Sequence, residues 1–304
     1  MLRSLSLTAA AAILAGPAMA DGINYALIGY DYTNISADGV EDLNIGNLQG
    51  AVEYEFSQFL LSADVRHVNV EVDSESSSAT VYAFGAAYML SPEALVGLEV
   101  LGVEAEDADA TTGYGVYSQF QTAQYALGVH VSQQDSDQDN ITTNIYGEFV
   151  TSDALTLGVQ VNSESEFDGT TSYFSADYEQ GAIEARTFII SNNEVDGGLF
   201  GLSASYQFSA QFRVSAAYQT LYGEDTDDAD AFSVGGGYQI TDGMWIDASY
   251  GQIGGDTYID GIEIIQASLT YELGDRKRLD RRFAQAAIDD SRATGLVSLL
   301  NATP

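Results

Sequence analysis

EIIQASLTYEL, residues 263–273, is the clearest strand pattern in this chain, and the rest of the sequence repeats its plan. From Ile265 to Leu273 every second residue is apolar, and polar residues stand between them. Successive side chains of a strand point to opposite faces of a sheet, so this segment has one apolar face and one polar face. Such a strand fits both a soluble sheet and the wall of a membrane barrel with a wet interior. The recurrence of the pattern decides between these two structures.

Segments of this kind recur between residues 23 and 273. A strand with its connection averages about 16 residues, which suits strands of ~9–11 residues that cross a bilayer at a tilt. The even number of strands is typical of outer-membrane barrels. The sixteen predicted strands span roughly 23–32, 43–56, 59–71, 79–90, 95–105, 113–121, 124–134, 140–151, 155–165, 171–179, 182–192, 198–208, 211–223, 231–240, 244–254 and 262–273.

The connections between these segments alternate in length. Short ones, such as Ser57-Gln58 and Asp242-Gly243, alternate with longer acidic ones, such as DSESSS at 73–78 and GEDTDDAD at 223–230. An up-and-down barrel has turns on one side and loops on the other. A sheet that spans lipid must also close on itself, because every backbone polar group there needs a partner. The sequence therefore predicts an all-β fold, a closed up-and-down antiparallel transmembrane β-barrel of about 16 strands over residues 21–274, with a C-terminal helical tail.

Residues 1–20, MLRSLSLTAAAAILAGPAMA, have the pattern of a secretory signal peptide. Arg3 precedes an apolar stretch, and the small-x-small ending Ala18-Met19-Ala20 predicts cleavage before Asp21. The alternative is a transmembrane anchor, but the apolar core is nearer ~12 residues than the ~20 that a helical span needs. We expect the mature chain to begin near Asp21.

The charge of the chain is very uneven. Of the 45 acidic residues, 41 lie in residues 21–274, against three arginines and no lysine. Repulsion of this size excludes nucleic acid as a partner and favours cations. The acids fit equally well with simple solubility in a saline medium. The chain has no cysteine, so no disulfide holds this exported protein together.

Aromatic residues gather beside the short connections. A girdle at the membrane interface would place them there, and the alternative is aromatic capping of the core of an ordinary sheet. Within 59–71 the apolar parity changes near Arg66-His67, which predicts a β-bulge or an error in the assigned register. The aromatics are Phe56, Phe59, Phe120, Tyr125, Phe208, Phe212, Tyr238 and Trp245.

The composition changes after Leu273. GDRKRLDRR, residues 274–282, has five basic residues, and FAQAAIDDSRATGLVSLL after it has a helical pattern with a break at Gly295. We predict that 275–304 is a periplasmic basic and helical tail. It could dock at the barrel mouth or contact an acidic partner, but a loosely held extension is the more usual outcome for such a tail.

The signal peptide, the sixteen alternating segments, the longer acidic loops and the aromatics beside the turns together resemble a Gram-negative general porin. The resemblance covers residues 21–273 and implies a water-filled outer-membrane channel for small hydrophilic solutes, commonly a homotrimer. Two features depart from that pattern. The third long connection, EDADATT at 106–112, is too short for the inward loop that narrows such pores, and Tyr271 is followed by the tail instead of ending the chain.

If the apolar parity faces lipid, the other parity lines a hydrated lumen. Fixed acids there would raise the local concentration of cations and exclude anions, so we expect a cation-preferring pore. The alternative is that these groups are hydrated without any effect on flux. The predicted pore-lining residues are Glu53, Glu55, Asp64, Arg66, Glu99, Glu148, Asp177, Glu179, Glu184, Arg186, Arg213, Asp247 and Glu272.

Other kinds of site have weaker support in the sequence. DSDQDN at 135–140 begins like a calcium loop, but the pattern then requires Gly at its sixth position and Glu at its twelfth, where Asn140 and Tyr146 stand. His130 and Ser132 share a strand at a spacing that any sheet produces, so we predict no catalytic residue, no metal site and no cofactor. The competing functions are a closed structural or adhesive barrel and a soluble propeller, which would need a blade repeat of ~40–50 residues.

Overall fold

The computed structural model describes residues 22–282, except 38, 40, 74, 107–108, 136–139, 166–168, 195–196, 224–228 and 256–260. The predicted signal peptide, residues 1–20, lies outside the described residues. The described chain forms sixteen antiparallel strands, as the sequence predicted, and one helical turn at 279–282. No helix among these residues is long and apolar enough to cross a membrane.

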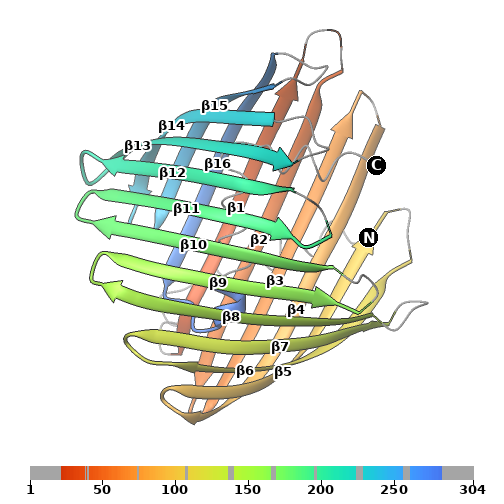
Figure 1. The fold of residues 1–304 in the computed structure, drawn as a ribbon, viewed down its shortest axis with the longest axis vertical. Coiled ribbons are helices and arrows are strands. Elements are labelled where there is room, and N and C mark those ends of the chain that lie inside the picture. The colour runs from red at the N-terminus through yellow and green to blue at the C-terminus, as the bar shows by residue number, and fades with distance from the viewer. Residues whose placement is uncertain are drawn as a thin grey trace.

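The strands follow one another around a single sheet, and each pairs with its neighbours in the sequence (Figure 1). In chain order they are β1 (Ile23–Ser36), β2 (Leu43–Phe56), β3 (Phe59–Val72), β4 (Glu75–Ser91), β5 (Ala94–Ala105), β6 (Thr111–Gln121), β7 (Tyr125–Asp135), β8 (Asn140–Ser152), β9 (Leu155–Glu164), β10 (Thr170–Gln180), β11 (Ile183–Asn192), β12 (Gly197–Gln207), β13 (Phe212–Gly223), β14 (Ala229–Thr241), β15 (Met244–Gly255) and β16 (Ile262–Gly274).

The first and last strands close the sheet into a barrel. β1 pairs with β16 from Tyr25 opposite Gly274 to Ser36 opposite Glu263. Closure removes both sheet edges, so the backbone N–H and C=O groups along these strands bond to each other. In lipid no water is available to bond to these groups, so this pairing is required there. The predicted closed barrel is confirmed.

The apolar parity faces outward, as predicted. Large apolar side chains such as Leu98, Leu127 and Ile145 are more than half exposed on the outside of the wall. Seven of the eight aromatics predicted for the girdle are also exposed there. Trp245 is the exception, because it shares the inward parity of Asp247 and lines the lumen. The girdle prediction is wrong at this residue, where parity along the strand outweighs proximity to a turn.

Several strands run beyond their predicted ends. β3 and β4 stay paired to Val72 opposite Glu75, so most of the predicted loop DSESSS is strand. Polar side chains are no obstacle to this pairing, because Glu75, Ser76 and Ser77 are exposed. The pairing of β3 is continuous from Phe59 to Val72 on both sides, so the predicted bulge at Arg66-His67 is wrong.

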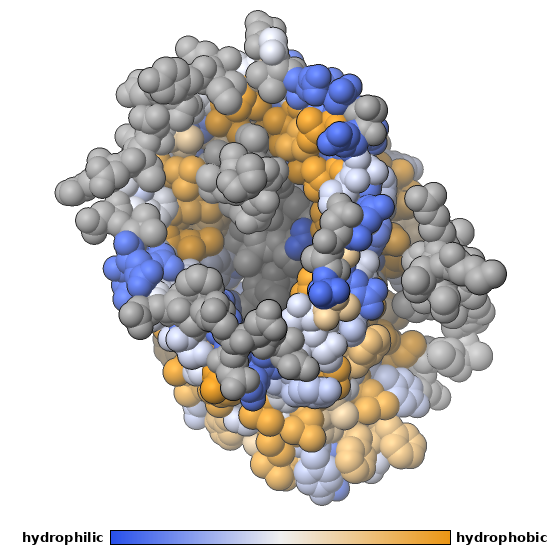
Figure 2. All heavy atoms as spheres, turned by 90° about the vertical axis from the view of Figure 1, so that its right-hand side faces the viewer, coloured by the Kyte–Doolittle hydropathy of each residue, from blue (hydrophilic) through white to orange (hydrophobic). Residues whose placement is uncertain are grey.

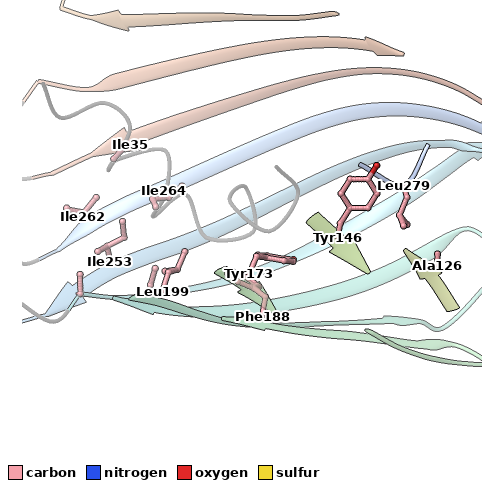
Figure 3. Close-up of a cluster of buried hydrophobic side chains, with 12 residues drawn as sticks. Ile35, Ala126, Tyr146, Tyr173, Phe188, Leu199, Ile253, Ile262, Ile264 and Leu279 are labelled. Atoms are coloured by element: carbon pink, nitrogen blue, oxygen red, sulfur yellow. The ribbon is translucent and has the colours of Figure 1, made fainter. Parts of the chain in front are cut away.

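The inner wall carries an apolar belt near the longer connections. We use this name for Ile35, Leu199, Ile253, Ile262 and Ile264, all buried with their side chains directed into the barrel (Figure 3). Figure 2 looks into one end of the barrel, where hydrophobic residues line part of the visible inner wall and hydrophilic ones gather on the rim. The sequence predicted a hydrated lumen, but part of the inner wall at this end is apolar.

Candidate functional site

The chain turns into the barrel directly after its last strand. Gly274 ends β16 with a φ of 73°, and a Cβ at this position would collide with the carbonyl oxygen of Asn24. Glycine therefore allows the turn at low cost. The following residues, 276–282, which we call the basic strip, lie against the inner faces of β2, β3, β5, β6 and β8.

Arg278 is the centre of the basic strip and is fully buried. Its guanidinium donates to Ser62 Oγ at 2.9 Å, to Glu99 Oε2 at 2.6 Å and to Asp280 Oδ2 at 2.6 Å. It also lies over the ring of Tyr117, 3.9 Å from the centroid. Burial alone would lower the pKa of Arg278, but the adjacent acids raise it above its ordinary value, so the charge is retained. These contacts satisfy a buried charge on several sides.

Two glycines make room for these charged groups on the inner wall. A Cβ on Gly85 would lie 2.5 Å from Arg278 Nη1, and a Cβ on Gly115 would lie 2.5 Å from His130 Nε2. His130 Nε2 is in turn 2.7 Å from Glu99 Oε1. The histidine that could have served a catalytic pair therefore meets this carboxylate instead of the hydroxyl of Ser132. The glycines and the charged groups together form a socket in the wall.

The wall also binds the backbone of the basic strip. Glu53 accepts from the N–H groups of Lys277 at 2.6 Å and Arg278 at 3.2 Å. Gln119 donates to the carbonyl of Lys277 at 2.7 Å and accepts from the N–H of Leu279 at 2.9 Å. These four bonds hold the main chain itself, whatever side chains it carries.

The remaining ion pairs complete this side of the lumen. Arg281 shares the Glu99 carboxylate with Arg278 at 2.7 Å. The sequence favoured a loosely held tail, and for residues 275–282 that prediction is wrong. The available signal was five bases directly after a barrel sequence that contains 41 acids. Spacing along the chain does not show where such a tail folds back. The other pairs join Arg276 to Asp64 at 2.5 Å, Lys277 to Glu55, and Arg282 to Glu148 at 3.1 Å.

The opposite side of the lumen is hollow. A cavity of about 790 Å³ is lined by β1 and by β10 to β16. Arg66 lies elsewhere on the inner wall, where its Nε donates to Asn47 Oδ1 at 3.0 Å. The lumen is thus divided into a filled side, formed by β2 to β8, and an open side. The predicted pore residues that line the open side are Asp177, Glu179, Glu184, Arg186, Arg213, Asp247 and Glu272.

Both arginines of the open side are paired with aspartates on neighbouring or nearby strands. Arg186 donates to Asp177 Oδ1 at 2.5 Å. Arg213 donates to both oxygens of Asp247 at 2.8 Å and lies 4.2 Å from the ring centroid of Trp245. Such bidentate and stacked contacts hold the guanidinium against the wall.

Trp245 is the single tryptophan of the chain, so its fluorescence reports on the open side. We expect Arg213→Ala to uncover the ring and free Asp247, because the guanidinium contacts both. Acrylamide quenching of Trp245 should rise, because the ring becomes more accessible from the cavity. Arg66→Ala, on the filled side, is the matched control, and equal quenching in both variants would contradict this assignment.

One cluster has the composition of a metal site. Ligand atoms of Glu99, His130 and Asp280 lie within 4.8 Å of one another. Arg278 and Arg281 already occupy the carboxylates, so a further cation would meet two guanidinium charges. This arrangement fits an ion-pair network better than a metal site. Most of the calcium-like stretch 135–140 lies outside the described residues.

Comparison with known proteins identifies the fold. No family model matches the chain, and no curated protein sequence matches it. Among solved structures, Pseudomonas aeruginosa OccK3 (OpdO) has 11% identity and a TM-score of 0.55, over 83% of this chain and 96% of that one. A mutant of the Rh. blastica porin has 14% identity and a TM-score of 0.54, over 82% and 100%. The CymD monoaromatic hydrocarbon channel has 11% identity and a TM-score of 0.51, over 84% and 89%. The predicted porin-like barrel is confirmed as a fold.

Proposed function

We propose that this protein is a passive pore in the outer membrane of a Gram-negative bacterium and that it passes small hydrophilic solutes. The observation that carries the proposal is the cavity of about 790 Å³, with charged side chains on its wall, inside a closed barrel whose outer face is apolar. An apolar outer band can contact lipid acyl chains, and a hydrated interior allows hydrophilic solutes to diffuse through the barrel. Export after removal of residues 1–20 and assembly as a homotrimer belong to the same proposal, and the tail would enter from the periplasmic end.

The open side supports a preference for cations. Each of its two arginines is paired with an aspartate, so those charges cancel locally. Asp31, Glu179, Glu184 and Glu272 are the other acids on the cavity wall. Fixed negative charge in a pore concentrates cations and repels anions. The filled side adds little to this field, because its acids are paired with the basic strip.

Single-channel recordings in planar bilayers with a salt gradient test both parts of the proposal. We expect open channels whose reversal potential favours the cation. The double variant Glu179→Gln/Glu184→Gln should lower the cation-to-anion permeability ratio by roughly twofold, because two charges leave the cavity wall. Glu41→Gln, in an exposed connection, is the matched control.

Each outcome has a distinct meaning. A purified, folded barrel that never conducts would favour the closed structural or adhesive alternative. Conductance with a reversal potential that favours chloride would remove the cation preference but keep the pore. An unchanged permeability ratio in the double variant would show that these two glutamates do not set selectivity.

A further inference from the structure

We propose that the C-terminal tail is a built-in plug. In this proposal the basic strip anchors the tail to an acidic binding site on β2 to β8, and the plug confines permeation to the open side. The inference rests on the proposed pore function for its effect on flux, but the docking itself is testable without conduction. What the wall binds is a basic peptide segment, here supplied by the same chain.

Charge complementarity is the first support for the plug. Five basic side chains of the strip pair with four acids of the wall, and a fifth acid, Glu53, binds main-chain N–H groups of the strip. The barrel sequence itself has only three arginines and no lysine. Without the strip, these acids would face one another on one side of a narrow lumen, where like charges repel. The acids are thus arranged for a cationic partner. They are Glu53, Glu55, Asp64, Glu99 and Glu148.

The fit of the wall to the strip is the second support. Gly85 leaves the space that the Arg278 guanidinium fills, and the ring of Tyr117 forms the floor of the socket. Glu53 and Gln119 bind main-chain groups of Lys277, Arg278 and Leu279, so the site holds the backbone of the strip as well as its side chains. A tail that touched the wall by chance would not show a buried guanidinium with these partners.

Truncation after Gly274 tests the effect on flux. The shortened barrel should conduct roughly twofold better than the full chain, because the filled side opens, and it should prefer cations more strongly, because five acids are freed. A synthetic peptide of residues 275–304, added to the truncated barrel, should restore the smaller conductance. The same peptide with its six basic residues replaced by glutamine should not.

Limited trypsin digestion tests docking in the full chain without any recording. Arg278 is fully buried, so cleavage after it requires the tail to leave the wall. Gly85→Val places carbon atoms where the guanidinium lies, and we expect cleavage after Arg278 to become about tenfold faster. Gly46→Val is the control, because a Cβ there meets only the Tyr30 hydroxyl, at 3.4 Å. Intact-mass spectrometry distinguishes this cut from one after Arg292.

The two experiments separate the two proposals. If neither the full nor the truncated chain conducts, the pore proposal fails, while protection from trypsin still decides whether the tail docks. If both chains conduct equally with the same selectivity, the plug proposal is wrong. Equally fast cleavage after Arg278 in the wild type and in Gly85→Val would also overturn it. Should the truncated chain fail to fold, the Gly85→Val variant takes its place in the recordings, with higher conductance expected.

Discussion

Glu99→Leu is expected to lower the free energy that holds the basic strip in its site by about 3–5 kcal/mol, the usual cost of removing one partner from a buried ion pair. The carboxylate of Glu99 is shared by Arg278, Arg281 and His130. Its loss leaves the fully buried guanidinium of Arg278 with Asp280 as its remaining ionic partner. The barrel strands themselves should stay paired, because their backbone bonds do not involve this side chain.

Hydrogen–deuterium exchange measures this change directly. The amide N–H groups of Lys277, Arg278 and Leu279 donate to wall side chains, so their exchange reports local opening of the strip. We expect this peptide to exchange far faster in Glu99→Leu, while peptides from β1 and β16 keep their protection. Glu104→Gln, exposed on the same strand, should leave both unchanged. Undiminished protection of the strip in Glu99→Leu would contradict the central role of this carboxylate.

Leu269→Arg is expected to destabilise the folded barrel in a bilayer by about 2–4 kcal/mol, as a cation on the lipid face near the midplane does. Leu269 points outward and lies opposite Tyr30 on one side and Ile246 on the other, and both of these residues are also exposed on the outer face. The measurement is reversible urea unfolding of the barrel in lipid vesicles, with the wild type alongside.

Ser268→Arg is the matched control for this prediction. Ser268 precedes Leu269 on β16 and has the opposite parity, so its side chain enters the lumen between Asp31 and Asp247. A new arginine there meets water and two acids, so we expect a loss of barrel stability well below that caused by Leu269→Arg. Equal losses in the two variants would mean that the outer face does not contact lipid.

The divided lumen changes how the charge of this protein is understood. From composition alone, every inward acid contributes equally to the field in the pore. In the structure, the acids of β2 to β8 are paired with the basic strip, and those of β10 to β16 line the cavity. In the plug proposal, the tail narrows the lumen, a role for which the connection 106–112 is too short. The proposed constriction and the proposed cation selectivity then depend on different acids.

Much of the wall could be predicted because strand patterns are local. Alternation at Ile265, Leu269 and Leu273 determines which face meets lipid, and turn residues between strands determine their order. Predicted strand ends were less accurate at 73–78, where β3 and β4 continue to pair through polar residues. Trp245 was placed in the girdle because it follows a short turn, although alternation along its strand gives it the inward parity of Asp247. The first error came from pairing with a neighbouring strand, and the second from weighing the turn above the alternation.

The sequence by itself determined the barrel and its sixteen strands, because each strand pairs with the next one in the chain. It also determined that acids predominate on the inward parity, because side chains alternate between the two faces with a period of two residues. Only the tertiary structure decided that Arg278 is buried against Glu99, which lies 179 positions earlier in the chain. No local pattern contains that contact. Closure of β1 on β16 brings the end of the chain to the mouth of an acidic lumen, and attraction between opposite charges at low dielectric draws the basic strip inside.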